Sequence, residues 1–182
     1  MRGFTHESAH NESKEWYTPR YIFRALGIDF DVDPASPGQD VVPWVPARVH
    51  YTVDDNGLTK GWRGQVFLNP PYGQDTPVWL EKMAEHGDGI ALVFSRTDTQ
   101  WFHQYAARAD AICFIEGRVK FVRAEDALLY ADGLIKPKGS CGAGSMLLAY
   151  GAASAEALMD CKLGLTLAVS QRAKEISNKR LF

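Results

Sequence analysis

Short hydrophobic runs alternate with helical patterns along most of the chain. Seven runs are predicted as strands, either from their apolar content or from the alternation of apolar and polar residues. The clearest alternation is IDFDVD at 28–33, which stops at Pro34. The predicted strands are 28–33, 48–53, 65–68, 89–95, 111–115, 119–122 and 145–150.

Each helix is predicted from the residues that begin and end it. Thr18 is a good N-cap, Pro19 suits the first helical position, and Gly27 suits the end. The same signals predict a helix from Asp75 or Thr76 to about His86, another from Asp98 to about residue 109, and one or two between 154 and 177.

Two stretches lack a regular pattern. Residues 34–47 contain four prolines and no helical period, and 124–144 are rich in loop-forming residues. Elsewhere, strands alternate with helices through the middle of the chain, which predicts an α/β fold with helices packed on a sheet. We expect the polar residues 1–14 to form a flexible N-terminal tail and 15–182 to form a single domain.

The composition restricts the classes of protein to consider. The 182 residues are 46% hydrophobic, which argues against a disordered chain. The longest apolar runs are far shorter than the roughly 20 residues of a membrane span, and the polar N-terminus has no signal-peptide core. Cys113, Cys141 and Cys161 are too widely spaced to form a disulfide framework. We therefore expect a cytoplasmic protein without membrane contact.

The charged residues and the histidines add two exclusions. Lys and Arg number 20 against 22 Asp and Glu, so the net charge of −2 provides no general attraction to nucleic acid. Binding of DNA or RNA must then use a local groove. The five histidines are scattered, whereas a zinc site needs clustered ligands, so no metal site is predicted.

The strongest chemical signal is Asn69-Pro70-Pro71-Tyr72, which directly follows the predicted strand 65–68. The prolines hold the preceding residues in extended geometry and supply no N–H group, so the loop is stiff and rich in acceptors. The Asn69 side-chain oxygen and the Pro70 carbonyl can lie side by side, which suits an amino group with two hydrogens to donate. The Tyr72 ring can stack on a planar base.

This arrangement suits methyl transfer to an exocyclic amine. Such an amine is a poor nucleophile because its lone pair is delocalised into the ring. Accepting its hydrogens returns the lone pair to the nitrogen, mainly in the transition state. The alternative is that the tetrapeptide is only a rigid turn that closes a strand.

The tetrapeptide is one of an ordered series of short motifs. They are EWYTP (15–19), DVDPAS (31–36), DDNGL (54–58), Trp62 with Gly64, NPPYG (69–73), TDT (97–99) with WF (101–102), and GRVKF (117–121). This series resembles the phage-type DNA N-6-adenine methyltransferase family over roughly residues 14–150.

The resemblance implies a fold and an activity. The fold is a Rossmann-like sheet of the S-adenosylmethionine-dependent methyltransferases, with helices on both faces and reduced in size. The activity is transfer of a methyl group from S-adenosylmethionine to the exocyclic N6 amine of adenine in double-stranded DNA, without a metal. The target adenine must flip out of the duplex to reach the site. A phage-encoded enzyme of this kind acts in the cytoplasm of its bacterial host.

The resemblance also implies roles for the matching residues. The implied catalytic residues are Asn69, Pro70, Pro71 and Tyr72. The implied cofactor-binding residues are Tyr17, Thr18, Pro19, Asp33, Pro34, Ala35, Ser36, Asn69, and one of Asp54 and Asp55. The expected contacts to the base or to DNA are Tyr72, Arg118, Phe121, Lys136 and Lys138.

Ordinary structural roles are open for several of these residues. Thr18 can serve as a helix cap, Asp33 as a turn residue, and Phe121 as a core aromatic. The loop after Asp33 departs from the family pattern. Only Gly38 is present where a pair of glycines is usual, and 34–47 supplies no crossover helix.

Two other functions fit the same residues. A protein-glutamine or RNA amino-methyltransferase would use the same NPPY chemistry on another substrate. A catalytically silent nucleic-acid-binding decoy would retain the fold with a decayed cofactor site, and the short loop after Asp33 is the feature that favours it. Cofactor binding and methylation assays on DNA, RNA and protein separate the three.

Overall fold

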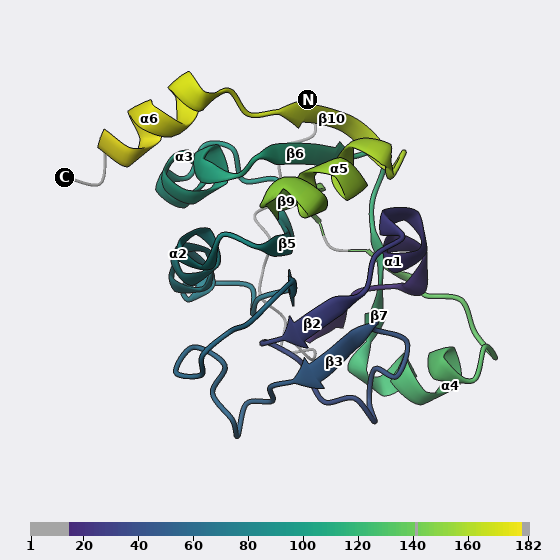
Figure 1. Ribbon diagram of the computed structural model, residues 1–182. Coiled ribbons are helices and arrows are strands. Elements are labelled where there is room, and N and C mark those ends of the chain that lie inside the picture. The colour runs from purple at the N-terminus through teal and green to yellow at the C-terminus, as the bar shows by residue number, and fades with distance from the viewer. Residues whose placement is uncertain (1–14, 141, 180–182) are drawn as a thin grey trace.

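A seven-stranded mixed sheet forms the centre of the computed structural model, which describes residues 15–140 and 142–179 (Figure 1). The strand order across the sheet is β3-β2-β4-β5-β9-β6-β10. The strands are β2 (Phe30–Asp33), β3 (Ala47–His50), β4 (Val66–Leu68), β5 (Gly89–Phe94), β6 (Ala111–Ile115), β9 (Ser145–Tyr150) and β10 (Gly164–Ala168).

The strand directions bring several strand ends to one edge. β3, β2, β4 and β5 are parallel neighbours. β9 is antiparallel to both β5 and β6, so β6 runs in the same direction as β5. The carboxyl ends of five strands therefore lie along one edge of the sheet, which is where open α/β sheets bind their ligands.

Helices cover both faces of the sheet (Figure 1). α1 (Arg20–Leu26) and α5 (Ala152–Asp160) pack on one face, and α2 (Thr76–His86) and α3 (Gln100–Tyr105) pack on the other. Alternate residues of β5 enter the two cores, with Ile90 and Leu92 on the α1 side and Ala91 and Val93 on the α2 side. The predicted Rossmann-like methyltransferase architecture is thereby confirmed.

A second, three-stranded sheet joins the beginning of the chain to its middle. β1 (Trp16–Tyr17) pairs antiparallel with β7 (Lys120–Arg123), and β7 pairs with β8 (Gly139–Ser140). The predicted strand at 119–122 therefore exists but belongs to this small sheet. Between β7 and β8, the 3-10 turn η2 (Ala124–Asp126) and the helix α4 (Ala127–Ala131) occupy part of a stretch that was expected to be loop.

Two predicted helix caps are wrong. α1 begins at Arg20, and Pro19 takes the N-cap position with extended backbone, so Thr18 lies before the helix. α3 begins at Gln100 after Thr99, so Asp98 does not cap it, and the 3-10 turn η1 (Ala106–Arg108) completes that helix. Pro19 itself has an extended backbone, with φ of −74° and ψ of 151°, so the first helical residue is Arg20 and Thr18 lies one position too early to cap it.

The chain between β2 and β3 contains no helix, as the prolines of 34–47 predict. Hydrophobic residues of this irregular segment cover the sheet instead, because Val42 and Val45 are buried in the same core as α1. None of the described helices has the length and apolar character that a membrane crossing requires.

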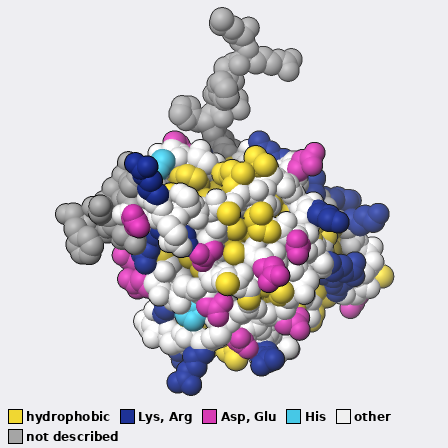
Figure 2. Space-filling view, turned by 45° about the horizontal axis from the view of Figure 1, so that its top comes forward, with side chains coloured by type: hydrophobic (Ala, Val, Ile, Leu, Met, Phe, Trp, Pro, Cys, Tyr) yellow, Lys and Arg dark blue, Asp and Glu magenta, His cyan; other side chains and the backbone are white. Residues whose placement is uncertain are grey.

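The C-terminal part holds a strand that the sequence analysis missed. β10 follows α5 and is the edge strand of the main sheet, and α6 (Gln171–Lys179) follows it. Leu165 and Leu167 of β10 are exposed, and hydrophobic side chains gather among charged ones on this side of the molecule (Figure 2). The alternating leucines at 163, 165 and 167 are a strand pattern, so this part of the predicted helical stretch 154–177 is corrected to a strand.

The loop after β3 packs against the loop after β2 at a position where only glycine fits. A Cβ at Gly57 would lie 1.9 Å from the carbonyl oxygen of Pro34. The Gly57 carbonyl accepts hydrogen bonds from Trp62 Nε1 (2.8 Å) and from Lys82 Nζ of α2 (3.2 Å). These contacts explain the glycine and the tryptophan of the DDNGL and Trp62 motifs, because they bring two loops together at the carboxyl edge.

We expect Gly57→Ala to lower the free energy of unfolding by about 1–3 kcal/mol, because backbone atoms cannot make room for the added methyl group. Gly61→Ala is the matched control, since a Cβ at Gly61 meets nothing within 4 Å. Urea denaturation of the two variants tests this. Equal stability of the two variants would contradict the packing argument.

Candidate cofactor and base site

Asn69 follows β4 at the carboxyl edge of the sheet. Its Nδ2 atom donates a hydrogen bond to the Trp16 carbonyl of β1 at 2.7 Å. A backbone carbonyl can only accept, so this bond fixes which end of the amide is the nitrogen. The Oδ1 atom is therefore the acceptor on the other side, where it receives the Tyr72 hydroxyl at 2.9 Å.

The loop that carries Asn69 is held by the start of α2. The Thr76 hydroxyl donates to the Pro71 carbonyl at 3.1 Å and accepts from the Gly73 amide at 3.2 Å. Pro70 is buried. These bonds keep the NPPY segment in one conformation without help from a ligand.

Three aromatic side chains surround Tyr72 or its neighbours. Tyr72 stacks on Phe94, the last residue of β5, with ring centroids 3.8 Å apart and an interplanar angle of 14°. Phe121 meets the Tyr72 ring at its edge, 6.2 Å between centroids, and meets Trp16 at 6.3 Å. Phe121 is fully buried, so in this conformation it supports Tyr72 and Trp16 and offers no open face of its own.

Asp33 ends β2 and is almost completely buried. Its Oδ1 atom accepts the Ala35 amide at 3.3 Å, which holds the turn of the DVDPAS motif. Burial raises the pKa of this carboxyl to about 7, and hydrogen bonds from Ala35 and Ser36 oppose the rise. A buried carboxyl of this kind is favoured in its ionised form when a ligand brings a donor or a positive charge to it.

His50 is a neighbour of this carboxyl that the sequence analysis did not select. Its Nδ1 atom lies 2.8 Å from the Ser36 hydroxyl and 3.9 Å from Asp33 Oδ2. Its Nε2 atom lies 3.1 Å from the Ala47 carbonyl. His50 ends β3, so the register of the parallel pair, in which Asp33 is opposite His50, brings them together. The sequence places them 17 residues apart, and no spacing rule connects them.

The Tyr17–Pro19 segment lies beside Asn69, because the residue before it, Trp16, binds the Asn69 amide. The Thr18 carbonyl accepts a hydrogen bond from Trp44 Nε1 at 2.8 Å. The Thr18 hydroxyl is buried and has no hydrogen-bond partner among the described residues. Buried hydroxyls are nearly always paired, so this one fits the polar part of a bound ligand.

The two acidic residues after β3 differ in their surroundings. Asp55 Oδ2 accepts hydrogen bonds from the Thr52 amide (2.9 Å) and the Thr52 hydroxyl (3.0 Å), and these bonds lower the pKa of Asp55. Asp54 is exposed in the same turn. Asp55 thus stabilises the turn that presents Gly57 to Pro34, whereas Asp54 has its side chain in solvent.

The basic residues expected to contact DNA are all exposed. Arg118 lies in the loop after β6, at the carboxyl edge of the main sheet. Lys136 and Lys138 lie in the segment that leads into β8. Gly139 of β8 pairs with Phe121 of β7. Lys138 comes directly before Gly139, and Arg118 comes shortly before β7. The two basic residues therefore lie next to a pair of hydrogen-bonded strands.

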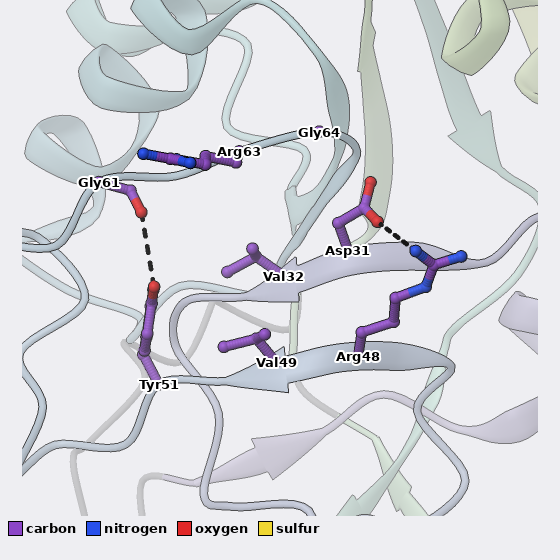
Figure 3. A pocket seen from close by; sticks show the side chains of 8 residues that line it. All are labelled: Asp31, Val32, Arg48, Val49, Tyr51, Gly61, Arg63 and Gly64. Carbon is purple, nitrogen blue, oxygen red and sulfur yellow. Dashed lines mark hydrogen bonds and ion pairs between the residues drawn. The ribbon is translucent and has the colours of Figure 1, made fainter.

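A separate groove of about 410 Å³ opens on the outer strands β2 and β3 (Figure 3). Val32 and Val49 form its floor, the Arg63 side chain lies across it, and Arg48 pairs with Asp31 at 3.4 Å. None of the predicted site residues lines this groove. No group of three or more His, Cys, Asp or Glu side chains is placed to hold a metal ion within residues 15–140 and 142–179.

The comparison with family models supplies the deciding observation. Residues 6–139 match the model of the DNA N-6-adenine-methyltransferase (Dam) family, which is more than half of the chain. The chain belongs to this family. The comparisons with curated proteins and with solved structures gave no match.

The matched range of the DNA N-6-adenine-methyltransferase family includes nearly all of the site. It contains the Tyr17–Pro19 segment, the loop after β2, the NPPY segment and β7. The short loop after Asp33 retains one glycine where it is needed, because Gly38 has a φ of 113° and donates its amide to the Ser36 hydroxyl at 3.1 Å.

The burial of Asp33 predicts a pH dependence of stability. Between the ordinary carboxyl value of 3.8 and about 7, the folded protein holds a proton that the unfolded chain has released. The stability that the protonated Asp33 carboxyl contributes to the folded protein is complete below about pH 3.8 and is lost as the pH rises through about 7. Relative to Asp33→Asn, wild-type stability should fall by up to about 4 kcal/mol across this window.

Chemical denaturation of both proteins at a series of pH values measures this difference. Subtracting the unfolding free energies of the two proteins at each pH cancels the contributions of the other titrating groups, His50 included, as far as these groups behave alike in both proteins. A constant difference between pH 4 and 8 would show that Asp33 is ionised throughout in the folded protein.

Proposed function

We propose that the protein transfers a methyl group from S-adenosylmethionine to the N6 amine of an adenine flipped out of double-stranded DNA. The observation that carries the proposal is the fixed amide of Asn69, whose acceptor oxygen lies at the carboxyl end of β4 and receives the Tyr72 hydroxyl. The membership of the DNA N-6-adenine-methyltransferase family supports the substrate class.

The chemistry of the site supports this reaction at the amine. Asn69 Oδ1 accepts a hydrogen of the amine, with the Pro70 carbonyl as the second acceptor. The lone pair of the nitrogen would then be available to attack the methyl carbon. The bond from that carbon to the sulfonium sulfur would break to leave a neutral thioether, and the nitrogen would release one proton to solvent. Because Trp16 holds the amide in place, the acceptor is oriented before the reaction begins, which is how such interactions lower a barrier.

The cofactor fits the polar groups around the carboxyl end of β2. When bound, S-adenosylmethionine supplies a methyl group on an already activated sulfonium, so no metal is required. The residues that would hold it are Asp33 and the loop to Ser36, the Tyr17–Pro19 segment and Asn69. The unpartnered Thr18 hydroxyl favours a polar ligand at this place, and so does the buried Asp33 carboxyl, because a donor or positive charge from a ligand would lower its raised pKa.

Tyr72 must change partners for the base to enter. In this structure its hydroxyl occupies the Asn69 acceptor and its ring covers Phe94. In the complex, the amine takes the acceptor and the base stacks on an aromatic face. Arg118, Lys136 and Lys138 contact the phosphates of the DNA around the flipped base, in keeping with their exposure.

The direct test is to analyse plasmid DNA from cells that express the chain, by a sequencing method that detects modified adenine. Purified protein is then assayed with labelled S-adenosylmethionine on DNA, RNA and a glutamine-containing peptide. Label in DNA alone is expected. Label only in RNA or peptide would favour the other amino-methyltransferase functions, and cofactor binding without any transfer would favour a silent DNA-binding protein.

We expect Asn69→Ala to reduce the single-turnover rate of methyl transfer by about 10² or more, because it removes an oriented transition-state acceptor. Tyr72→Ala should weaken DNA binding by about 1–3 kcal/mol through lost stacking. Tyr72→Phe is the control, since it keeps the ring and should retain most of the activity.

Calorimetric binding of S-adenosylmethionine should change little in the two Tyr72 variants, because the methyl donor lies on the other side of the reacting nitrogen. The rate of Asn69→Ala is measured at saturating cofactor, because Asn69 is also among the residues that would hold it. A wild-type transfer rate for Asn69→Ala would refute the role of its amide. A loss of cofactor binding in Tyr72→Phe would refute the division of roles.

A further inference from the structure

The carboxyl ends of β2 and β3 form a small buried polar cluster of Asp33, Ser36 and His50. The side chains of His50 and Asp33 are 4% and 6% exposed. The Ser36 hydroxyl lies 2.8 Å from His50 Nδ1, and hydrogen bonding from Ser36 also lowers the pKa of the Asp33 carboxyl. A hydroxyl has one hydrogen to donate, so Ser36 can serve only one of these two acceptors at a time.

The bonds around His50 decide where the Ser36 hydrogen goes. The Ala47 carbonyl lies 3.1 Å from Nε2 and can only accept, so the neutral ring carries its hydrogen on Nε2. Nδ1 is then an acceptor, and the Ser36 hydroxyl donates to it. The Ser36 oxygen in turn accepts the Gly38 amide at 3.1 Å, which completes a chain of bonds through the loop.

This chain has a consequence for Asp33. While Ser36 donates to His50, its hydrogen is not available to Asp33, so the carboxylate keeps that acceptor position for a donor from a ligand. If His50 could not accept, the Ser36 hydroxyl would turn to Asp33 and occupy the carboxylate. The loop between Asp33 and Gly38 would then lose its side-chain bond to His50 of β3, while the Ser36 amide would keep its bond to the Tyr51 carbonyl.

We propose that His50 is a positioning residue of the cofactor site, which takes the Ser36 hydrogen so that the Asp33 carboxylate stays open to the cofactor. The proposal rests on the proposed function, because it takes the ligand of Asp33 to be S-adenosylmethionine. His50 acts through Ser36 and Asp33 and does not itself contact the reacting atoms.

Two amide substitutions separate this role from simple packing. In His50→Asn the side-chain oxygen can take the place of Nδ1, so the acceptor for Ser36 is kept. In His50→Gln the amide reaches the place of Nε2 instead, so the contact to Ala47 is kept and the acceptor for Ser36 is lost. The two variants have the same functional group and differ in which bond of His50 they reproduce.

Calorimetry with S-adenosylmethionine gives the first readout. We expect His50→Gln to weaken binding about tenfold or more, which is typical of a buried hydroxyl left to seek another partner, while His50→Asn stays within about threefold of wild type. Adding Ser36→Ala to His50→Gln should restore part of the lost affinity, because the hydroxyl that competes for Asp33 is then gone while the backbone of the loop to Ser36 is retained for the cofactor. A merely structural role for His50 predicts further loss in the double variant.

Amide hydrogen exchange on the protein without ligand gives the second readout. The Gly38 amide should exchange faster in His50→Gln than in wild type and should keep its protection in His50→Asn. Thermal unfolding of each variant shows whether the fold is intact, and a variant that does not fold is replaced by the double variant with Ser36→Ala. Equal cofactor affinity of the Asn and Gln variants, or no recovery in the double variant, would overturn the proposal.

Binding of S-adenosylmethionine to the wild-type protein separates a failure of the proposed function from a failure of the role of His50. If wild type does not bind S-adenosylmethionine, the proposed function fails and the role of His50 fails with it. If wild type binds and both amide variants bind equally well, only the role of His50 fails.

Discussion

The hydrogen bond from Asn69 Nδ2 to the Trp16 carbonyl is the contact on which the site depends. It joins residues 53 positions apart in the sequence and ties the small sheet to the central one. It also determines the chemistry, because an amide whose nitrogen is engaged presents its oxygen as the acceptor. The short strand β1 therefore helps to orient Asn69 at the carboxyl edge, although it contributes only two residues to a sheet.

The loops at the carboxyl edge are held by close contacts, because no helix connects β2 to β3. The chain passes from β2 to the parallel strand β3 without a helix, and the irregular segment between them buries Val42 and Val45 against the sheet. The following turn is held by Asp55, by the close approach of Gly57 to Pro34, and by Lys82, which donates to the carbonyls of Leu58 and Lys60, both at 2.6 Å. The loops after β2 and β3 are thus held together without a crossover helix, because the backbones of Gly57 and Pro34 are in direct contact.

The sequence was sufficient for the parts of the fold that depend on local pattern. The strands at 111–115 and 145–150 and the helix α2 coincide with their predicted bounds, and the NPPY segment follows a buried strand as expected. Contacts across the sheet could not be predicted in this way. His50 meets Asp33 only through the register of β2 and β3, and Trp16 meets Asn69 only through the small sheet. The roles of the predicted site residues remain predictions that the variants above address.

The free protein protects the same groups that the proposed reaction uses. Tyr72 gives its hydroxyl hydrogen to Asn69 Oδ1 and its ring to Phe94, so neither a buried acceptor nor an aromatic face is left unpaired before DNA binds. An incoming adenine would replace a hydrogen bond with a hydrogen bond and a stack with a stack. In the proposed reaction, Asn69 Oδ1 would therefore keep a hydrogen-bond donor throughout, which limits the free-energy cost of the exchange at the site. More of the free energy of DNA binding would then be available for flipping the base, which costs a few kcal/mol.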